Sequence, residues 1–256
     1  MHWRCYDTFH GMPERACAGG IAVVIDVLRA STTIVTALFH GAAGVLPVLG
    51  VADARAAAHG GRLLGGERGG VRIEGFDLGN SPLEYAAERV RGRSLVVTTT
   101  NGTAALHACR GAREILIGAI VNRAAVAEAA RRLARHGLEV HLVCAGTDGA
   151  VSAEDVLAAG AILDAASAAG PDDVLDPAAL EARGFFRRVA ADGDVPAALV
   201  AEFRRSPGGA NLVDLGMQAD LPACAAIDSL PLVPRLDPAT GSLSAWREMV
   251  PGTESG

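Results

Sequence analysis

Residues that can hold an anion follow the first long apolar run of the chain. Residues 21–25 are all apolar, Asp26 comes next, and Arg29 follows three residues later. Ser31 and Thr32 then offer hydroxyl groups of the kind that cap helices. A buried strand that ends in an acid and turns into a helix brings together a carboxylate, a fixed cation and free backbone N–H groups. This combination suits a phosphate held beside a metal ion.

The same residues also have simpler interpretations, which the sequence leaves open. Asp26 can be only a turn former or a helix cap, and Arg29 can be a surface arginine. Ser31 and Thr32 can cap the helix and still donate to a bound phosphate, so those two roles are compatible. The place of Asp26 directly after an uninterrupted apolar run favours a metal ligand or a nucleophile over a turn former.

Polar residues also follow other predicted strands. Because ligands bind at the carboxyl ends of strands in open parallel sheets, these residues are expected at one shared edge. A single polar strand end is ordinary loop chemistry, whereas several converging ends indicate a site. Mg²⁺ prefers a few carboxylates together with water and phosphate oxygens, and the group contains such acids. Its members are Glu67, Arg68, Thr100, Asn101, Gly102, Thr103, Asn122, Glu154 and Asp155.

Two loops of this group can contact a phosphate. The turn at residues 99–103 contains Gly102, which lets the backbone approach an oxyanion closely, but a β-turn before a capped helix explains it equally well. The loop from Glu67 to Ser81 is long for a compact domain, and such loops are often functional. Asn80 in this loop either shapes the turn or contacts the ligand.

The acids near residue 155 have two interpretations. Ser152 followed three residues later by Asp155 fits the capping box of a helix. That interpretation accounts for Asp155 and leaves Glu154 unexplained. Either acid can instead bind Mg²⁺.

Strand and helix signals alternate through the first two thirds of the chain. Such alternation predicts an α/β fold with a mostly parallel sheet covered by helices on both faces. Aromatic residues make up only 4% of the chain, so the core must consist of Ala, Val, Leu and Ile, as suits parallel sheets. The expected strands span residues 21–28, 45–49, 62–65, 95–99, 114–120 and 139–145, and the expected helices 32–40, 52–59, 81–90, 103–109, 123–136 and 153–169.

The pattern changes after residue 172, where helices predominate. We expect one α/β domain over residues 1–240, with residues about 172–215 as a helical lobe, and a loose C-terminal tail over residues 241–256. The expected helices span residues 177–191, 195–205 and 211–215, and short edge strands are expected at 223–228 and 232–234.

The composition excludes several classes of function. All 23 basic residues are arginine, so neither a Schiff-base lysine nor a Walker lysine is available. The net charge of −6 argues against a nucleic-acid-binding surface, and the longest apolar run is too short for a membrane span. Five scattered cysteines without a C-x-x-C pair favour a reduced, cytoplasmic protein, and the first residues do not resemble a signal peptide.

Several known catalytic motifs are absent or misplaced. Arg135-His136-Gly137 copies the histidine-phosphatase triplet but ends a predicted helix, which Gly137 is expected to terminate. The seven histidines have no zinc-ligand spacing. No G-x-G-x-x-G motif follows the first strand, which argues against a nucleotide-binding enzyme of the doubly wound type.

Taken in order, a set of short motifs resembles the 2-phosphosulfolactate phosphatase family over about residues 21–230. The resemblance implies a Mg²⁺-dependent phosphatase with a three-layer α/β/α sandwich fold. It also implies hydrolysis of (2R)-O-phospho-3-sulfolactate to (2R)-3-sulfolactate and phosphate, a step towards coenzyme M. The motifs are IDVLRASTT at 25–33, GGER at 65–68, GFDLGNSP at 75–82, TTNGT at 99–103, CAG at 144–146 and SAED at 152–155.

For such an enzyme we expect Asp26, Arg29 and Glu67 to be catalytic. Mg²⁺ would be held by Asp26 with one or two of Glu67, Glu154 and Asp155. Asp26 either binds the metal or attacks phosphorus. The haloacid-dehalogenase D-x-D signature is absent, because Leu28 occupies its second acid position, and this favours a ligand. The expected substrate contacts are Arg68, Ser31, Thr32, Asn80, Thr100, Asn101, Gly102 and Thr103.

Two other functions stay open at this point. One is a phosphatase for a related small phosphoester. The other is a non-catalytic sensor of a small phosphorylated anion, which needs the arginines and the 99–103 turn but not the acids. In each case the partner is a small anion, neither nucleic acid nor a membrane is expected, and assembly into a homo-oligomer is left open.

Overall fold

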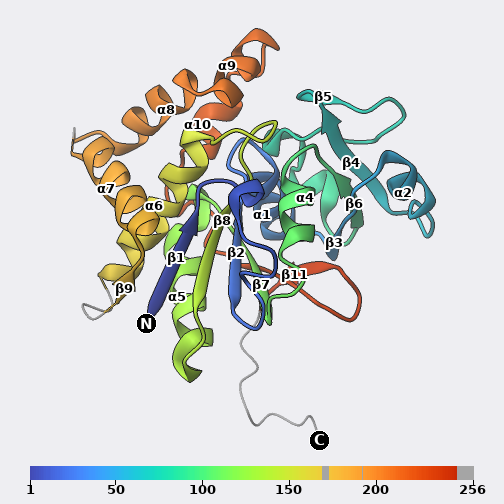
Figure 1. Cartoon of the computed structure of the whole chain (residues 1–256). Helices are drawn as coiled ribbons and strands as arrows, with labels where there is room; N and C mark the ends of the chain where they lie inside the picture. Colours follow the sequence, from blue (N-terminus) through green and yellow to red (C-terminus); the bar gives the residue numbers. More distant parts are fainter. Residues whose placement is uncertain (169–172, 192, 247–256) are drawn as a thin grey trace, which may run out of the picture.

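The computed structural model describes residues 1–168, 173–191 and 193–246. Within these residues one 11-stranded sheet runs through the molecule in the order β5-β4-β6-β3-β11-β10-β7-β2-β8-β1-β9 (Figure 1). Its strands are β1 His2–Tyr6, β2 Ile21–Ile25, β3 Gly44–Pro47, β4 Leu63–Arg68, β5 Val71–Arg72, β6 Ser94–Thr98, β7 Glu114–Gly118, β8 Val140–Cys144, β9 Val174–Leu175, β10 Pro234–Leu236 and β11 Leu243–Ala245.

Helices follow most strands of this sheet, so the α/β prediction is confirmed. The α-helices are α1 Ala30–Phe39, α2 Val51–Ala56, α3 Ala87–Val90, α4 Gly102–Ala108, α5 Arg123–Leu133, α6 Ala153–Ser167, α7 Pro177–Ala190, α8 Val195–Arg205, α9 Pro207–Asp214 and α10 Asp220–Cys224. Short 3-10 helices lie at Phe9–Gly11, Pro82–Glu84, Ile120–Asn122 and Ala134–His136. None of the described helices is both long and apolar enough to cross a bilayer.

The central strand β2 explains the uninterrupted apolar run of the sequence. It pairs in parallel with β7 on one side and β8 on the other, and all five of its residues are buried. Val23 packs in a core cluster that contains residues of α5 and α6, whereas Val24 packs in a second cluster that contains residues of α1. Because alternate residues of a strand point to opposite faces, the sheet is covered on both sides.

The sheet is mostly parallel, with an antiparallel hairpin inserted in it. β10 and β11 pair with each other, and they join β7 to β3 through further antiparallel contacts. The helices α7, α8 and α9 lie beside α6 at one side of the sheet (Figure 1). A Cβ atom on Gly160 of α6 would lie 2.1 Å from the carbonyl oxygen of Ala182 of α7, so this close crossing requires glycine.

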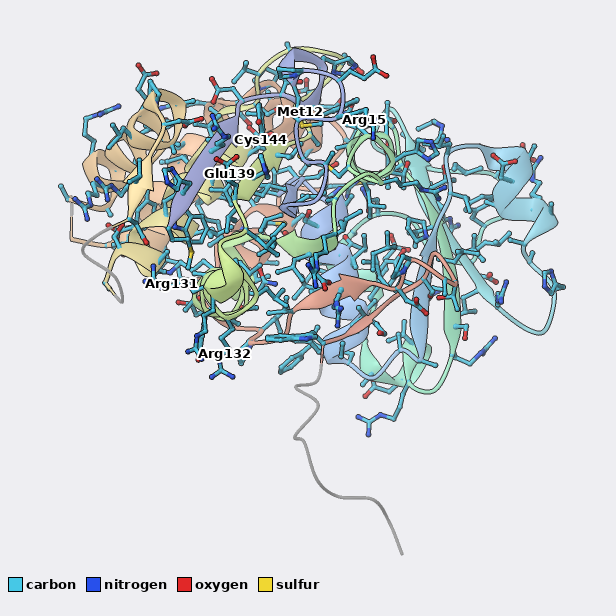
Figure 2. All side chains as sticks on the ribbon, turned by 60° about the horizontal axis from the view of Figure 1, so that its bottom comes forward. Met12, Arg15, Arg131, Arg132, Glu139 and Cys144 are labelled. Atoms are coloured by element: carbon cyan, nitrogen blue, oxygen red, sulfur yellow. The ribbon has the colours of Figure 1, made fainter. Side chains whose placement is uncertain are left out.

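All five cysteines are free and buried, in agreement with a chain that does not rely on disulfides. The thiol of Cys17 donates to the sulfur of Met12 at 3.3 Å. Figure 2 shows Met12 in the segment between β1 and β2, and Cys144 at the end of β8.

Several predicted elements need correction. The helix expected at 81–90 is split into a 3-10 helix and α3, because the buried Tyr85 turns inward and its hydroxyl donates to the carbonyl oxygen of Gly79. The edge strand expected at 223–228 is wrong. That segment begins in helix α10, where Leu221 and Cys224 are both buried at helical spacing.

Other differences concern the ends of the chain. β1 was not expected, although its buried Trp3 and Cys5 alternate with more exposed residues. The edge strand expected at 232–234 lies two residues further on, as β10. The tail expected from residue 241 includes β11, which pairs with the sheet, while residues 247–256 of that prediction lie outside the described residues. The division into one domain with a helical lobe stays a prediction.

Candidate active site

Loops at the carboxyl ends of four parallel strands meet at one small cavity of about 120 Å³. Asp26 follows β2, Glu67 ends β4, Asn101 follows β6 and Thr147 follows β8. The predicted convergence of polar strand ends is therefore confirmed for these strands. The cavity is lined by Asp26, Leu28, Arg29, Glu67, Gly69, Gly70, Asn80, Thr100, Asn101, Thr147, Asp148, Gly208, Asn211 and Leu212.

Asp26 lines this cavity with only 8% of its surface exposed. One carboxylate oxygen accepts a hydrogen bond from the backbone N–H of Ala30, at 3.1 Å, while the backbone N–H of Asp26 donates to the hydroxyl of Ser31. Burial raises the pKa of Asp26 to about 7, and the nearby Glu67 and Glu154 carboxylates add to this rise. A bound cation would lower the pKa again, because it favours the ionised form.

Gly102 is the residue that makes room for Asp26. A Cβ atom at this position would lie 2.6 Å from Asp26 Oδ2 and 2.7 Å from the Cβ atom of Ala30. Gly102 is also the first residue of α4, so glycine lets the start of this helix pack directly against the acid. The glycine of the 99–103 turn therefore serves close packing against a carboxylate.

Glu67 connects the turn after β4 to the loop after β6. One of its oxygens accepts from the backbone N–H of Thr100 at 2.8 Å and from the Thr100 hydroxyl at 3.1 Å. The other accepts from the backbone N–H of Gly70 at 2.8 Å. A carboxylate with this many donors is well fixed, and only the oxygen that accepts from Gly70 has a lone pair left to face a cation.

Asp155 fixes the backbone beneath the cavity. Its two oxygens accept from the backbone N–H of Val27, at 2.8 Å, and from that of Gly146, at 3.0 Å, so it joins the loops after β2 and β8. Burial raises the pKa of Asp155 well above its usual range, and Asp26 and Glu154 raise it further. The capping-box interpretation is wrong, because Ser152 makes no side-chain capping hydrogen bond.

Glu154 lies close behind the cavity wall. A Cβ atom on Gly208, which lines the cavity, would lie 2.6 Å from Glu154 Oε1. The other oxygen, Oε2, is buried and has no hydrogen-bond partner in the described structure. Burial raises the pKa of Glu154 as well. A buried carboxylate oxygen without a partner is costly, so this atom marks a place where a cation or a water would be stabilising.

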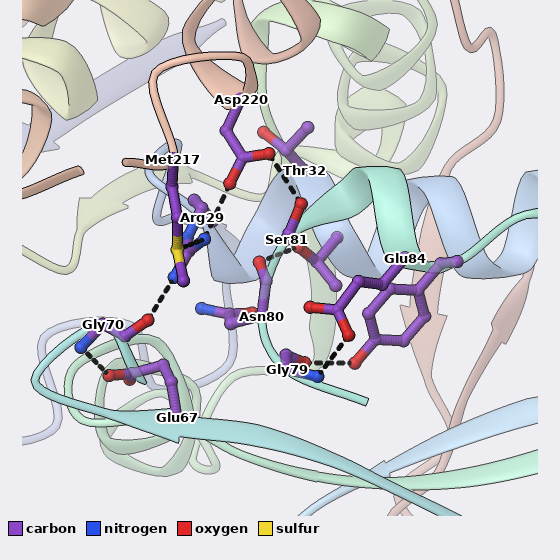
Figure 3. A network of polar contacts seen from close by, with 12 residues as sticks. Arg29, Thr32, Glu67, Gly70, Gly79, Asn80, Ser81, Glu84, Met217 and Asp220 are labelled. Carbon is purple, nitrogen blue, oxygen red and sulfur yellow. Dashed lines mark hydrogen bonds and ion pairs between the residues drawn. The ribbon is translucent and has the colours of Figure 1, made fainter. Parts of the chain in front are cut away.

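Arg29 is held from three sides, as Figure 3 shows. Its Nη1 atom lies 2.7 Å from Asp220 Oδ2, and both side chains are almost fully buried. Its Nη2 donates to the carbonyl oxygen of Gly70 at 2.8 Å, and Met217 contributes a sulfur at 3.0 Å from Nη1. The second oxygen of Asp220 accepts from the hydroxyl of Ser81 at 2.6 Å. The guanidinium is thereby fixed at the edge of the cavity.

Similarity to known proteins agrees with these features. The family model for 2-phosphosulpholactate phosphatase matches residues 6–238. The chain belongs to this family. A relative from Symbiobacterium thermophilum named "Probable 2-phosphosulfolactate phosphatase" is 45% identical over 228 residues, which cover 87% of this chain and 93% of the relative. A relative of the same name from Deinococcus radiodurans is 44% identical over 221 residues, covering 85% of this chain and 88% of the relative.

In this member of the 2-phosphosulfolactate phosphatase family, part of the predicted site lines the cavity. The expected residues that do so are Asp26, Arg29, Glu67, Asn80, Thr100 and Asn101. Ser31, Thr32 and Thr103 bond to nearby backbone instead: Ser31 accepts from Asp26, Thr32 donates to Val27, and Thr103 donates to Thr99.

Arg68 is turned away from the cavity. Its guanidinium donates to the carbonyl oxygen of Glu67, to the hydroxyl of Thr98 and to the carbonyl oxygen of Leu49. Asn122 is also a structural residue, because its side chain accepts from Ala119 and donates to backbone carbonyls. Neither residue lines the cavity in the described structure.

Sequence reasoning missed a second set of residues at this cavity. Asp220 was not expected, and no sequence motif marks it. Gly70, Asp148, Gly208 and Asn211 line the cavity without having been predicted. Gly208 and Asn211 belong to α9, so the helices after residue 172 supply one wall of the site.

The charges at the cavity favour a metal ion. Its lining contains three acids, Asp26, Glu67 and Asp148, and a single arginine that is already paired with Asp220. Among the described residues, no three His, Cys, Asp or Glu side chains are arranged to hold a metal by themselves. Mg²⁺ commonly needs only one or two carboxylates, because water and substrate phosphate supply its other ligands. The donor set and the unpartnered Glu154 oxygen fit such an ion.

Proposed function

We propose that this protein is a Mg²⁺-dependent phosphatase that hydrolyses (2R)-O-phospho-3-sulfolactate to (2R)-3-sulfolactate and phosphate. The family membership supports the substrate, and the charge of the cavity supports the metal. The substrate carries a phosphate, a sulfonate and a carboxylate. A cavity with three acids and one paired arginine repels such an anion, so a cation must accompany it.

The observation that carries the metal proposal is the position of the carboxylates. Asp26 is buried and lines the cavity with one oxygen unbonded among the described residues, and Glu154 Oε2 is buried without a partner. We assign Asp26 as the main protein ligand, with Glu67 or Glu154 as the second. When bound, Mg²⁺ would neutralise the transferring phosphoryl group and activate a water molecule.

The other residues of the chain bind and orient the substrate. Asn80 and Asn101 line the cavity and offer side-chain amide donors, whereas both donors of Thr100 already bond to Glu67. The first residues of α4 and α9 reach the same place through Asn101 and Gly208, so the positive ends of both helices favour an anion there. Arg29, fixed by Asp220, supplies a permanent positive charge.

The test is phosphate release from (2R)-O-phospho-3-sulfolactate and a panel of small phosphoesters, each with Mg²⁺ and with EDTA. We expect Mg²⁺-dependent release that is fastest with phosphosulfolactate. Release that is equally fast in EDTA would refute the metal proposal. A faster reaction with another ester would reassign the substrate. Tight binding in EDTA without release would support a sensor.

Two further properties belong to the proposal. The buried free cysteines support a reducing compartment, and we propose the cytoplasm. The proposed product, (2R)-3-sulfolactate, would be an intermediate on a route to coenzyme M.

A further inference from the structure

A second and larger cavity, of about 520 Å³, lies beside α4. It shares no lining residue with the candidate active site. Its apolar lining comes from Leu46 of β3, Leu106 of α4, Ile115 of β7 and Leu236 of β10. The loop that joins β10 to β11 closes one side through Pro238 and its neighbours. Cavities of this size commonly hold small organic molecules.

The rim of this cavity is positively charged. His107, Arg110 and Arg113 line it, and none of the three side chains has an ion-pair or hydrogen-bond partner within the described ranges. The acid of the lining, Asp53, accepts a hydrogen bond from the backbone N–H of Gly50 at 3.1 Å. The lining therefore holds two arginines and one acid, although the whole chain has a net charge of −6.

We propose that this second cavity binds a small organic anion with an apolar body, such as an aryl or acyl phosphate or sulfonate. The apolar floor would bury the hydrocarbon part, and Arg110 and Arg113 would face the anionic group at the rim. The ligand differs in class from the compact, fully polar phosphoester proposed for the active site, whose cavity is much smaller. The proposal does not depend on the phosphatase activity.

The experiment uses 8-anilinonaphthalene-1-sulfonate, a fluorescent aryl sulfonate, titrated into the full chain. We expect one saturable binding event per chain. Arg110→Ala combined with Arg113→Ala should weaken it about tenfold, a loss of about 1.4 kcal/mol that is shared between two partly exposed ion pairs. Ala239→Trp, which adds a large ring at an exposed residue of the cavity lining, should abolish binding.

The matched control is the double variant Arg188→Ala and Arg204→Ala, which removes two exposed arginines that line neither cavity. It should bind the probe as the natural protein does. Because the probe also binds partly unfolded proteins, thermal unfolding of each variant must be cooperative and near that of the natural protein.

Three outcomes would overturn the proposal. In the first, the Arg110 and Arg113 double variant binds the probe with unchanged affinity. In the second, Mg²⁺ with inorganic phosphate displaces the probe, which would place it in the active site. In the third, sedimentation shows a dimer that the same two substitutions dissociate, which would make this face a contact between copies of the chain.

Discussion

Arg29 and Asp220 form a buried ion pair that joins the loop after β2 to the start of α10, with 2.7 Å between Nη1 and Oδ2. Both side chains are 3% exposed or less, so each charge depends on the other for compensation. Asp220 also accepts from Ser81, which places three distant segments in one contact. The pair therefore fixes the one arginine that lines the described active-site cavity.

Removing Asp220 should destabilise the protein strongly. Asp220→Ala leaves the buried Arg29 guanidinium without its counter-charge, and breaking such a pair costs about 3–5 kcal/mol. Urea unfolding monitored by circular dichroism measures the change. The control is Glu202→Ala, which removes the partner of the exposed Arg205 and should cost less than about 1 kcal/mol. Equal effects of the two substitutions would contradict the assigned importance of the buried pair.

Gly102→Ala should reduce activity by about 100-fold or more, because a misplacement of about 1 Å at a catalytic group can have an effect of that size. The added Cβ atom would lie 2.6 Å from Asp26 Oδ2, so the carboxylate or α4 must move. The control is Gly111→Ala, whose added Cβ atom would be no closer than 3.9 Å to any neighbour outside its adjacent residues. A Gly102→Ala enzyme with normal kcat/KM would show that Asp26 need not keep its present position.

The metal-free protein should lose stability as pH rises from about 5 to 7. Burial raises the pKa of Asp26 to about 7, and the pKa values of Glu154 and Asp155 are raised as well. The folded protein then binds more protons than the unfolded chain between about pH 4 and 7, so stability falls with pH in that window. Each pKa unit corresponds to about 1.4 kcal/mol, and urea unfolding in EDTA at several pH values measures the slope.

Asp26→Asn is the matched variant for this pH dependence. It removes one of the three titrating acids and should flatten the slope without reversing it. Mg²⁺ should stabilise the natural protein most at high pH, where the carboxylates are ionised. Stability that increases from pH 5 to 7 in EDTA would contradict the raised pKa values.

Arg29 and Arg68 should differ in their effect on catalysis. Arg29 lines the cavity, where it would contact the anionic substrate. Arg29→Ala should therefore lower kcat/KM by about 1,000-fold, which is the size of effect expected when a buried charged contact is lost. Arg68 bonds only to Glu67, Thr98 and Leu49 in the described structure, so Arg68→Ala should lower it less than about tenfold. Steady-state kinetics on phosphosulfolactate measures both. A larger loss for Arg68→Ala would show that this side chain turns inward when substrate binds.

The acids at the strand ends of the active site could be predicted, because each follows an apolar run that is typical of a buried strand. Asp26 and Glu67 were found in this way. Arg68 was misplaced because it is adjacent to Glu67 on β4, and consecutive side chains of a strand point to opposite sides. That alternation was available in the sequence, and applying it would have separated the two residues.

Asp220 could not have been predicted by the same reasoning. It lies 191 residues from Arg29, at the start of the short helix α10. The sequence pattern did not predict this helix and indicated a strand at residues 223–228 instead. Only tertiary packing brings the two together. Asp155 illustrates a related difficulty: its sequence position fits a capping box, but its carboxylate bonds to the backbone of Val27 and Gly146 instead. Local patterns do not show which distant N–H groups a buried acid will meet.

The central claim is that the acidic cavity works on its anionic substrate only with Mg²⁺. The most direct measurement is the rate of phosphate release from (2R)-O-phospho-3-sulfolactate as Mg²⁺ is titrated into EDTA-treated enzyme, for the natural protein and for Asp26→Asn. We predict negligible release without Mg²⁺, a saturable increase with it, and negligible release from Asp26→Asn at every concentration. Full activity without Mg²⁺, or in Asp26→Asn, would contradict the claim.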